Sequence, residues 1–339
     1  MPQSLTPQAL SWEPAGVLHS LRRTIEVLLQ ANHVVVIAHA NPDGDAISST
    51  LAVGYLLDLL RIRNTLVNSD PVPSGLKHLH GAARVVFPHQ VEQSPDVVVA
   101  LDCGEPHRLG DNVPAGWLQG TLIVLDHHDK WSFPDHTVAV RDPDAACTGE
   151  LVYRMVVESG LQLDPELARL LLTALYFDTG SFRYGCTTSG TMELAAALYR
   201  TGVDAWALTS LIYENVPLAR VRLQGEALRG LRLSPCGRLA GFVISDDMLT
   251  RAGATPDACD GLVNQARAIA GVEIAWQVHC EEGRVHLAVR SRGNLDVRPI
   301  ALALGIKGSA FAANGWFDAG EELVAEGVES SFATVYGTP

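Results

Sequence analysis

Short, unbroken apolar runs alternate with helical patterns along the first two-thirds of the chain. The runs Val34–Ala38, Val97–Leu101 and Leu122–Leu125 contain only aliphatic residues, which is typical of strands buried on both faces of a parallel sheet. Between and after these runs, Ala46–Leu60 and Pro165–Tyr176 have helical patterns. The alternation predicts a parallel-sheet α/β domain.

The pattern changes in the last third of the chain. The amphipathic stretch Pro217–Gly230 predicts a connecting helix, and Leu239–Ser245 predicts a strand. Thr255-Pro256 is a helix start signal, with threonine as N-cap and proline at the first helical position. Val272–Cys280 and Arg284–Arg290 flank a short polar turn and predict a hairpin. We therefore expect a first domain over residues 1–212, a helical linker over 213–235 and a smaller α+β domain over 236–339.

Composition and charge narrow the class of protein. The 339 residues include 25 Lys and Arg against 38 Asp and Glu, which gives a formal net charge of −13. Such a chain is a poor electrostatic partner for long duplex nucleic acid. It has no apolar stretch of membrane-spanning length and no secretory signal at its start. Its six cysteines lie far apart without a C-x-x-C, so we expect reduced thiols and a cytoplasmic protein.

Acid and imidazole groups follow three of the predicted strands. His39, Asp43 and Asp45 come after the first strand, and Asp102 comes after the second. Asp126-His127-His128 follows the third strand, and Asp178 ends a predicted helix. Open α/β sheets bind ligands at the carboxyl ends of their strands, so we expect these groups to meet in one crevice.

The charges in such a crevice call for cations. Five aspartates within about 4–6 Å of one another would strongly raise one another's pKa. Two divalent cations would offset most of that repulsion. Oxygen and imidazole ligands without thiolate favour Mn²⁺, with Mg²⁺ and Co²⁺ as alternatives. A single aspartate after a strand is ordinarily a helix cap or a turn residue. The combination from four distant segments favours a two-metal site.

At these residues the sequence resembles the DHH phosphoesterase family, which is named for the Asp-His-His at Asp126–His128. His39–Asp45 is similar to the family's first motif, His-x-x-Pro-Asp-Gly-Asp, and Asp102 and Asp178 lie in stretches similar to its second and fourth motifs. The resemblance runs from about residue 15 to the end. Within the family, the chain resembles bacterial enzymes that act as oligoribonuclease and 3′-phosphoadenosine-5′-phosphate phosphatase. It implies a DHH domain joined by a helical linker to a DHH-associated C-terminal domain.

The resemblance also implies a role for each residue of the crevice. His39 and Asp43 would bind one metal, Asp45, His127 and Asp178 the other, and Asp102 would bridge the two. His128 would face the scissile phosphate, and Asp126 would orient a histidine. Arg183, beyond Asp178, is a candidate phosphate contact. The alternative for Arg183 is an ordinary solvated loop arginine.

The C-terminal third contains a local cationic segment. Across residues 284–298 four arginines and one aspartate give a charge of +3, and Arg290, Ser291 and Arg292 resemble the family's substrate-binding strand and turn. The family's Gly-Gly-Gly-His loop is altered here. The stretch Gly305–Gly315 has Lys307 in place of a glycine and Ser309 in place of the histidine. Lys307 could replace, as a point charge, the substrate contact that the family's loop would make.

Together these features predict a Mn²⁺-dependent phosphoesterase. It would cleave very short oligonucleotides, linear dinucleotides or 3′-phosphoadenosine-5′-phosphate by in-line attack of a metal-bridging hydroxide. A cyclic dinucleotide phosphodiesterase and a catalytically silent nucleotide sensor stay open as alternatives, as does a homodimer. Family II inorganic pyrophosphatases share the acidic crevice. They are disfavoured because the segment beyond residue 236 has Lys307 as its single lysine.

Overall fold

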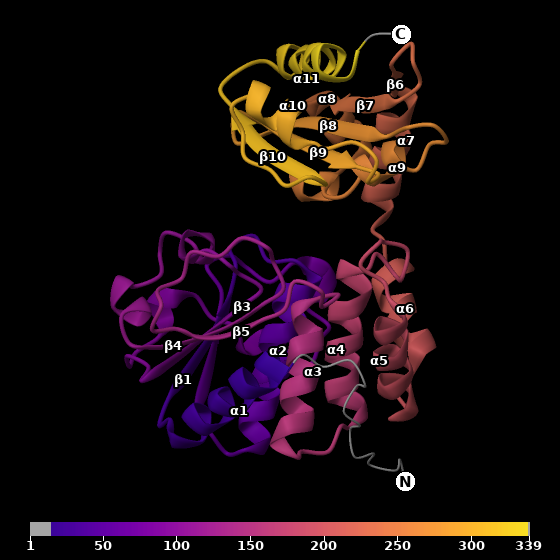
Figure 1. Cartoon of the computed structure of the whole chain (residues 1–339). Helices are drawn as coiled ribbons and strands as arrows, with labels where there is room; N and C mark the ends of the chain where they lie inside the picture. The colour runs from indigo at the N-terminus through magenta and orange to yellow at the C-terminus, as the bar shows by residue number, and fades with distance from the viewer. Residues whose placement is uncertain (1–14, 338–339) are drawn as a thin grey trace. The chain divides into compact units, whose positions relative to one another are not determined.

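The computed structural model describes residues 15–337 and divides the chain into two compact units between Asn215 and Val216 (Figure 1). The expectation about a secretory signal concerns residues 1–14, which lie outside the described part. The helix expected near residues 217–230 is α7 (Leu218–Arg229), which belongs to the second unit. The linker limits of 213 and 235 stay a prediction. Among the helices of residues 15–337, none combines the length and apolar character needed to cross a lipid bilayer.

The first unit is built on a parallel sheet, which confirms the α/β prediction. Its strand order is β2-β1-β3-β4-β5, and every pairing is parallel. The three predicted strands are β1 (Val34–Ala38), β3 (Val97–Leu101) and β4 (Thr121–Asp126), and they occupy the centre of the sheet. The edge strands β2 (Asn64–Val67) and β5 (Val138–Arg141) are shorter and more polar. The apolar pattern alone did not reveal these two.

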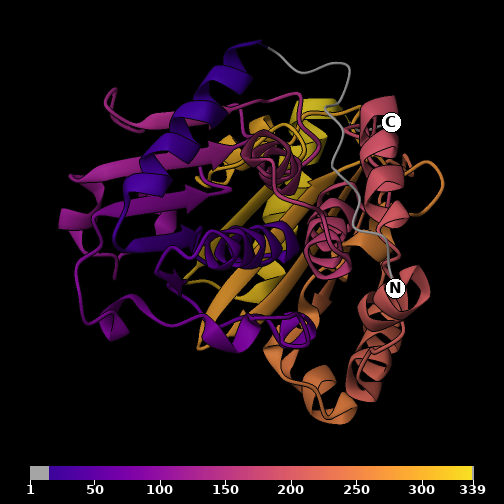
Figure 2. The ribbon, with the colours of Figure 1, turned by 90° about the horizontal axis from the view of Figure 1, so that it is seen from below.

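Helices cover one face of this sheet and loops cover the other (Figures 1 and 2). The helix α2 packs against both β1 and α4, so nearly all of its residues are buried. On the opposite face, Leu109, Trp117 and Phe133 from loops and 3₁₀ turns close the core. The helices of this unit are α1 (Ala15–Gln30), α2 (Gly44–Leu59), α3 (Thr148–Ser159), α4 (Pro165–Asp178), α5 (Ser189–Arg200) and α6 (Ala205–Tyr213).

The second unit is an α+β fold around a mixed sheet with the order β10-β9-β8-β7-β6. The predicted hairpin is confirmed, with Glu282 and Gly283 at positive φ in its two-residue turn. Only β7 and β8 pair in parallel within this sheet. The strands are β6 (Arg232–Leu233), β7 (Leu239–Ile244), β8 (Ile274–Glu281), β9 (Arg284–Ser291) and β10 (Ala312–Phe317). The helices besides α7 are α8 (Asp246–Ala252), α9 (Val263–Arg267), α10 (Arg298–Ala303) and α11 (Glu321–Tyr336).

Two local expectations in this unit differ from the structure. Thr255-Pro256 starts a 3₁₀ turn, η6 (Pro256–Cys259), and the following α9 begins only at Val263. Gly261, at a φ of +72°, breaks the helix between them. The stretch Gly305–Gly315, compared above with a glycine loop, is a loop only in its first part and then enters β10. The Ile306 side chain packs against the core of this unit. It also lies close to Gly315, where a Cβ would be 2.3 Å from it.

Candidate metal centre

Four separate segments bring acid and imidazole groups to the carboxyl edge of the first sheet. β1, β3 and β4 end there, and α4 ends close enough for Asp178 to contact His127. Gly44 permits this approach, because a Cβ there would lie 2.0 Å from the Phe177 ring. The predicted residues are His39, Asp43 and Asp45 after β1, Asp102 after β3, Asp126, His127 and His128 at the end of β4, and Asp178 at the end of α4.

The ligand atoms of these residues fall into two main groups. One group is His39, Asp43 and Asp102, and the other is Asp45, His127 and Asp178; within each, the ligand atoms lie within 4.8 Å of one another. Asp102 lies between the groups. Its Oδ2 is 3.4 Å from Nε2 of His39, and its Oδ1 is 3.5 Å from Nε2 of His127. Asp102, His127 and His128 form a third such group, and the division of ligands that the family resemblance implies stays a prediction.

The backbone of Asp102 is held in an unusual conformation. Its φ is +56°, in the left-handed region that non-glycine residues rarely adopt, and its side chain is buried. Its N–H donates to the carbonyl oxygen of Leu125 at 3.0 Å, which continues the β3–β4 pairing through the turn. The surrounding sheet therefore stabilises a strained residue at the centre of the site, as is common at functional positions.

Both central histidines have one ring nitrogen engaged by the backbone. Nδ1 of His39 lies 2.8 Å from the carbonyl oxygen of Ala40, and Nδ1 of His127 lies 3.3 Å from that of Ala145. A proton on Nδ1 satisfies each carbonyl and leaves Nε2 directed at the carboxylates. Metal-binding histidines characteristically donate their second N–H in this way. Imidazole and carboxylate donors in this arrangement fit a divalent cation such as Mn²⁺.

The N-terminus of α3 holds two of the carboxylates, a contact that the sequence analysis missed. The N–H groups of Thr148 and Gly149 donate to the Asp45 carboxylate at 2.7 and 3.0 Å, and Ser49 Oγ donates to it at 2.8 Å. The Thr148 hydroxyl also donates to Asp102 Oδ1 at 3.1 Å. The available signal was the Thr148-Gly149 pair at the start of a helical pattern. Nothing in the sequence says which carboxylate such a start would face.

Asp126, the first residue of the Asp-His-His motif, orients the second histidine of the motif, His128. Nδ1 of His128 lies 2.7 Å from Oδ1 of Asp126, whose side chain is fully buried. Because a carboxylate can only accept, the proton between them belongs to Nδ1 of His128. The other ring nitrogen of this half-exposed histidine is left as an acceptor in its neutral form.

Burial and mutual charge shift the pKa values across the centre. Burial disfavours the charged imidazoles, but hydrogen bonds and charge from Asp102 outweigh it and raise the pKa of His39 to about 9 and of His127 to about 12. The same two histidines hold the pKa of buried Asp102 well below its usual range. Burial, followed by the charges of Asp102 and Asp178, raises the pKa of Asp45 well above the ordinary value. The N–H groups of α3 oppose that last shift.

The remaining predicted residues lie elsewhere. Arg183 is exposed, and its Nε donates to the carbonyl oxygen of Gly180.

In the second unit, Arg290 donates to the Ala313 carbonyl and the Asn314 side chain, and Arg292 donates to the Ile269 carbonyl.

Ser291 and Ser309 serve turns of the second unit. The buried Ser291 hydroxyl donates to the Leu295 carbonyl, and that of Ser309 accepts from two backbone N–H groups. Lys307 is exposed.

Comparison with known proteins gives relatives for nearly the whole chain. Residues 33–175 match the family described as DHH family, N-terminal domain. The bifunctional oligoribonuclease and PAP phosphatase NrnA of Thermus thermophilus is 32% identical over 309 residues, which cover 91% of this chain and 89% of that protein. A probable manganese-dependent inorganic pyrophosphatase of Lactobacillus acidophilus is 28% identical over 178 residues, covering 50% of this chain and 55% of the relative.

A solved structure is similar in fold over most of the chain. The exopolyphosphatase-related protein of Bacteroides fragilis superposes with a TM-score of 0.85 at 22% identity, covering 93% of this chain and 96% of its own. The family match spans β1, β3, β4 and nearly all of α4, and the Thermus relative extends through the second unit. On this evidence the chain belongs to the DHH family.

Proposed function

We propose that this protein is a metal-dependent phosphoesterase that hydrolyses oligonucleotides of a few residues, linear dinucleotides and 3′-phosphoadenosine-5′-phosphate. The observation that carries the proposal is the pair of ligand groups with Asp102 between them at the carboxyl edge of the parallel sheet. The similarity to the Thermus oligoribonuclease and PAP phosphatase over 91% of the chain supports the substrate class.

The proposed cofactor is a pair of Mn²⁺ ions. His39 and Asp43 would hold one ion, Asp45, His127 and Asp178 the other, and Asp102 both. Such a pair, when bound, would stabilise charge on the phosphoryl group and make a nucleophilic water more acidic. The donor set and the name of the Lactobacillus relative favour manganese over other divalent cations.

The chain's own residues would orient the ligands and move a proton. Asp126 fixes the His128 ring with the proton on Nδ1, so Nε2 is free to take a proton or, when protonated, to donate to a phosphate oxygen. The N–H groups of α3 hold Asp45 in one orientation. These fixed groups need no rearrangement during the reaction, which favours catalysis.

Residues of the second unit, in and beyond the cationic segment 284–298, are proposed to bind phosphate groups. Arg290, Arg292 and Lys307 are proposed phosphate contacts, because each carries a positive charge in a chain of net charge −13. Arg183 in the first unit is a fourth candidate. Ser291 and Ser309, whose hydroxyls stabilise turns, would act by shaping the segment. The spacing of the cysteines supports the cytoplasm as the proposed location.

The test is hydrolysis by the purified full chain with added Mn²⁺. RNA of two to five residues and 3′-phosphoadenosine-5′-phosphate are the substrates, and mass spectrometry identifies the products. Asp102→Asn should abolish turnover, whereas Asp129→Asn, a change at an exposed aspartate next to the motif, should leave it unchanged. Absence of product from every substrate, or undiminished turnover by Asp102→Asn, would overturn the proposal.

A further inference from the structure

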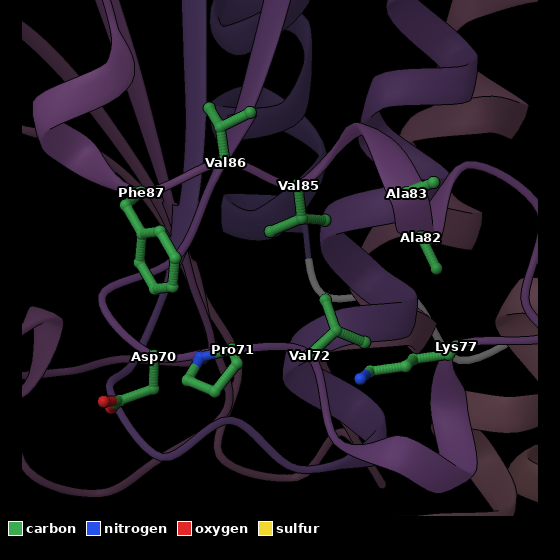
Figure 3. Close-up of a pocket in the computed structure, with 9 residues that line it drawn as sticks. All are labelled: Asp70, Pro71, Val72, Lys77, Ala82, Ala83, Val85, Val86 and Phe87. Carbon is green, nitrogen blue, oxygen red and sulfur yellow. The ribbon is translucent and has the colours of Figure 1, made fainter.

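A pocket lies within the first unit, next to the loop that follows β1. The segment 70–77, which follows β2, and the segment 82–87 enclose a pocket of about 280 Å³ (Figure 3). Phe87 and Val85 from one segment face Pro71 and Val72 from the other. Its walls are therefore mainly apolar. No residue assigned above to metal binding or phosphate contact lines it.

One hydrogen bond ties the lining residue Asp70 to the loop that carries the candidate metal ligands, and a second ties the neighbouring Asn68, which does not line the pocket, to the same loop. The N–H of Asn41 donates to Oδ2 of Asp70 at 2.6 Å, and Nδ2 of Asn68 donates to the carbonyl oxygen of His39 at 3.0 Å. Asn41 adopts a positive φ of +50° and lies two residues from both His39 and Asp43. Asp70 is therefore linked through Asn41 to the loop that carries the candidate ligands His39 and Asp43.

The aromatic wall of the pocket is held in a fixed plane. Val86 pairs with Val67 and extends the parallel sheet beyond β2, which fixes the backbone next to Phe87. The His89 ring, which is outside the pocket lining, stacks on Phe87 with ring centroids 5.7 Å apart and planes inclined by 8°. A side chain supported in this way can act as a stacking platform for another planar ring.

Polar groups occur at two places on the rim. Lys77 is one of only three lysines in this acidic chain, and its exposed side chain extends toward Val72 (Figure 3). Asp70 also lines the pocket, but its carboxylate points away from the other lining side chains (Figure 3). A planar apolar group with a nearby negative charge fits the apolar walls and Lys77. The volume is below the ~300–1,000 Å³ of pockets that enclose drug-sized ligands, so one ring system fits better than a whole nucleotide.

We propose that this pocket binds the nucleobase of the nucleotide next to the scissile phosphate, with Phe87 as the stacking surface and Lys77 near the sugar–phosphate chain. This inference rests on the proposed function and narrows its substrate class. The protein would prefer phosphodiesters that carry a base on both sides of the bond over those that lack one. Recognition by stacking would tolerate any base, because every base has a π-face.

The first experiment compares a diadenylate with its two singly abasic versions. The wild type should cleave one abasic version with a KM roughly five- to tenfold higher than that of the intact dinucleotide, as expected from loss of one stacked base. Phe87→Ala should raise the KM for the intact dinucleotide to the same level while kcat stays unchanged. Phe87→Leu, which keeps an apolar wall and is the safer variant for folding, should give a smaller rise. Trp206→Ala, at an exposed aromatic residue of α6, is the matched control and should change neither constant.

The second experiment measures binding without turnover. Calorimetry should show that the wild type binds adenosine 5′-monophosphate more tightly than ribose 5-phosphate, that Phe87→Leu narrows the difference, and that Lys77→Gln weakens both about equally. A wild type that cleaves no dinucleotide but retains this difference would reject the proposed function and keep the base pocket. Equal binding of the two ligands, or a difference that survives in both Phe87 variants, would overturn the pocket assignment.

Discussion

The hydroxyl of Thr148 donates a hydrogen bond to Asp102, and the N–H of the same residue donates to Asp45. One residue at the start of α3 therefore orients a carboxylate from each of the two candidate ligand groups. The N–H groups at the start of a helix lack partners within the helix, so an anion is favoured there. Position 149 has no room for a side chain, because a Cβ there would lie 2.5 Å from Cβ of Ala174 on α4.

Removing only the hydroxyl of Thr148 should weaken metal binding. Thr148→Val keeps the shape and the backbone N–H but loses the hydrogen bond to Asp102. Loss of such a supporting contact typically costs 10–100-fold in metal affinity, and we expect about tenfold here because the N–H contact with Asp45 remains. Titration calorimetry with Mn²⁺ measures the change. Thr148→Ser should bind Mn²⁺ like the wild type. An unchanged affinity in Thr148→Val would show that the Thr148 hydroxyl does not position Asp102 for metal binding.

The contact between Asp126 and His128 predicts a large effect from a change of one atom. In Asp126→Asn the amide can donate to Nδ1, which would place the imidazole proton on Nε2 and remove the acceptor there. We expect kcat to fall by at least about 100-fold, the lower bound for loss of general acid–base catalysis, with little change in KM. Nitrogen NMR of the histidine ring reports the proton position independently. A variant with normal kcat and the proton still on Nδ1 would contradict the assignment.

The central strands and the groups that follow them could be predicted because both signals are local. The aliphatic run Val97–Leu101 predicts a buried parallel strand, and Asp102 follows it directly. Because ligands bind at the carboxyl ends of the strands in such sheets, the same pattern predicts that Asp102 lies in the site. The contact between Thr148 and Asp45 could not be predicted, because it joins residues 103 positions apart through the packing of α3. β10 was missed because Asn314 and Gly315 have low strand propensity, and its pairing with β9 outweighs that preference.

The raised pKa values of two histidines predict that Mn²⁺ binding releases protons. With pKa values of about 9 for His39 and about 12 for His127, both imidazoles are protonated at pH 7 in the metal-free protein. A metal ligand must be a neutral imidazole, so the two histidines together should release close to two protons, and Asp45, whose pKa is also raised, can add to that number. The apparent affinity should then rise by about tenfold per pH unit for each proton released. Calorimetry in buffers of different ionisation enthalpy counts the protons.

Two histidine variants test this predicted number of released protons. His39→Gln should lower the count by one proton, whereas His136→Gln, at an exposed histidine outside the centre, should not change it. A count near zero in the wild type at pH 7 would mean that the imidazoles are already neutral before the metal binds.

A histidine in the second unit predicts how stability responds to acid. Burial, followed by the positive charges of His279 and Arg290, lowers the pKa of His286 to about 4, although Asp260 opposes the shift. The unfolded chain has a histidine pKa of about 6.5, so it binds a proton that the folded state does not as the pH falls from about 6.5 to 4. The neutral ring therefore contributes stability above about pH 6.5, and this contribution is lost across that interval.

His286→Phe keeps a ring against Trp316, whose centroid lies 4.7 Å away, and removes the titration. Its melting temperature should fall less steeply between pH 6.5 and 4.5 than that of the wild type, as measured by scanning calorimetry. Parallel slopes in the two proteins would exclude His286 as a source of acid sensitivity.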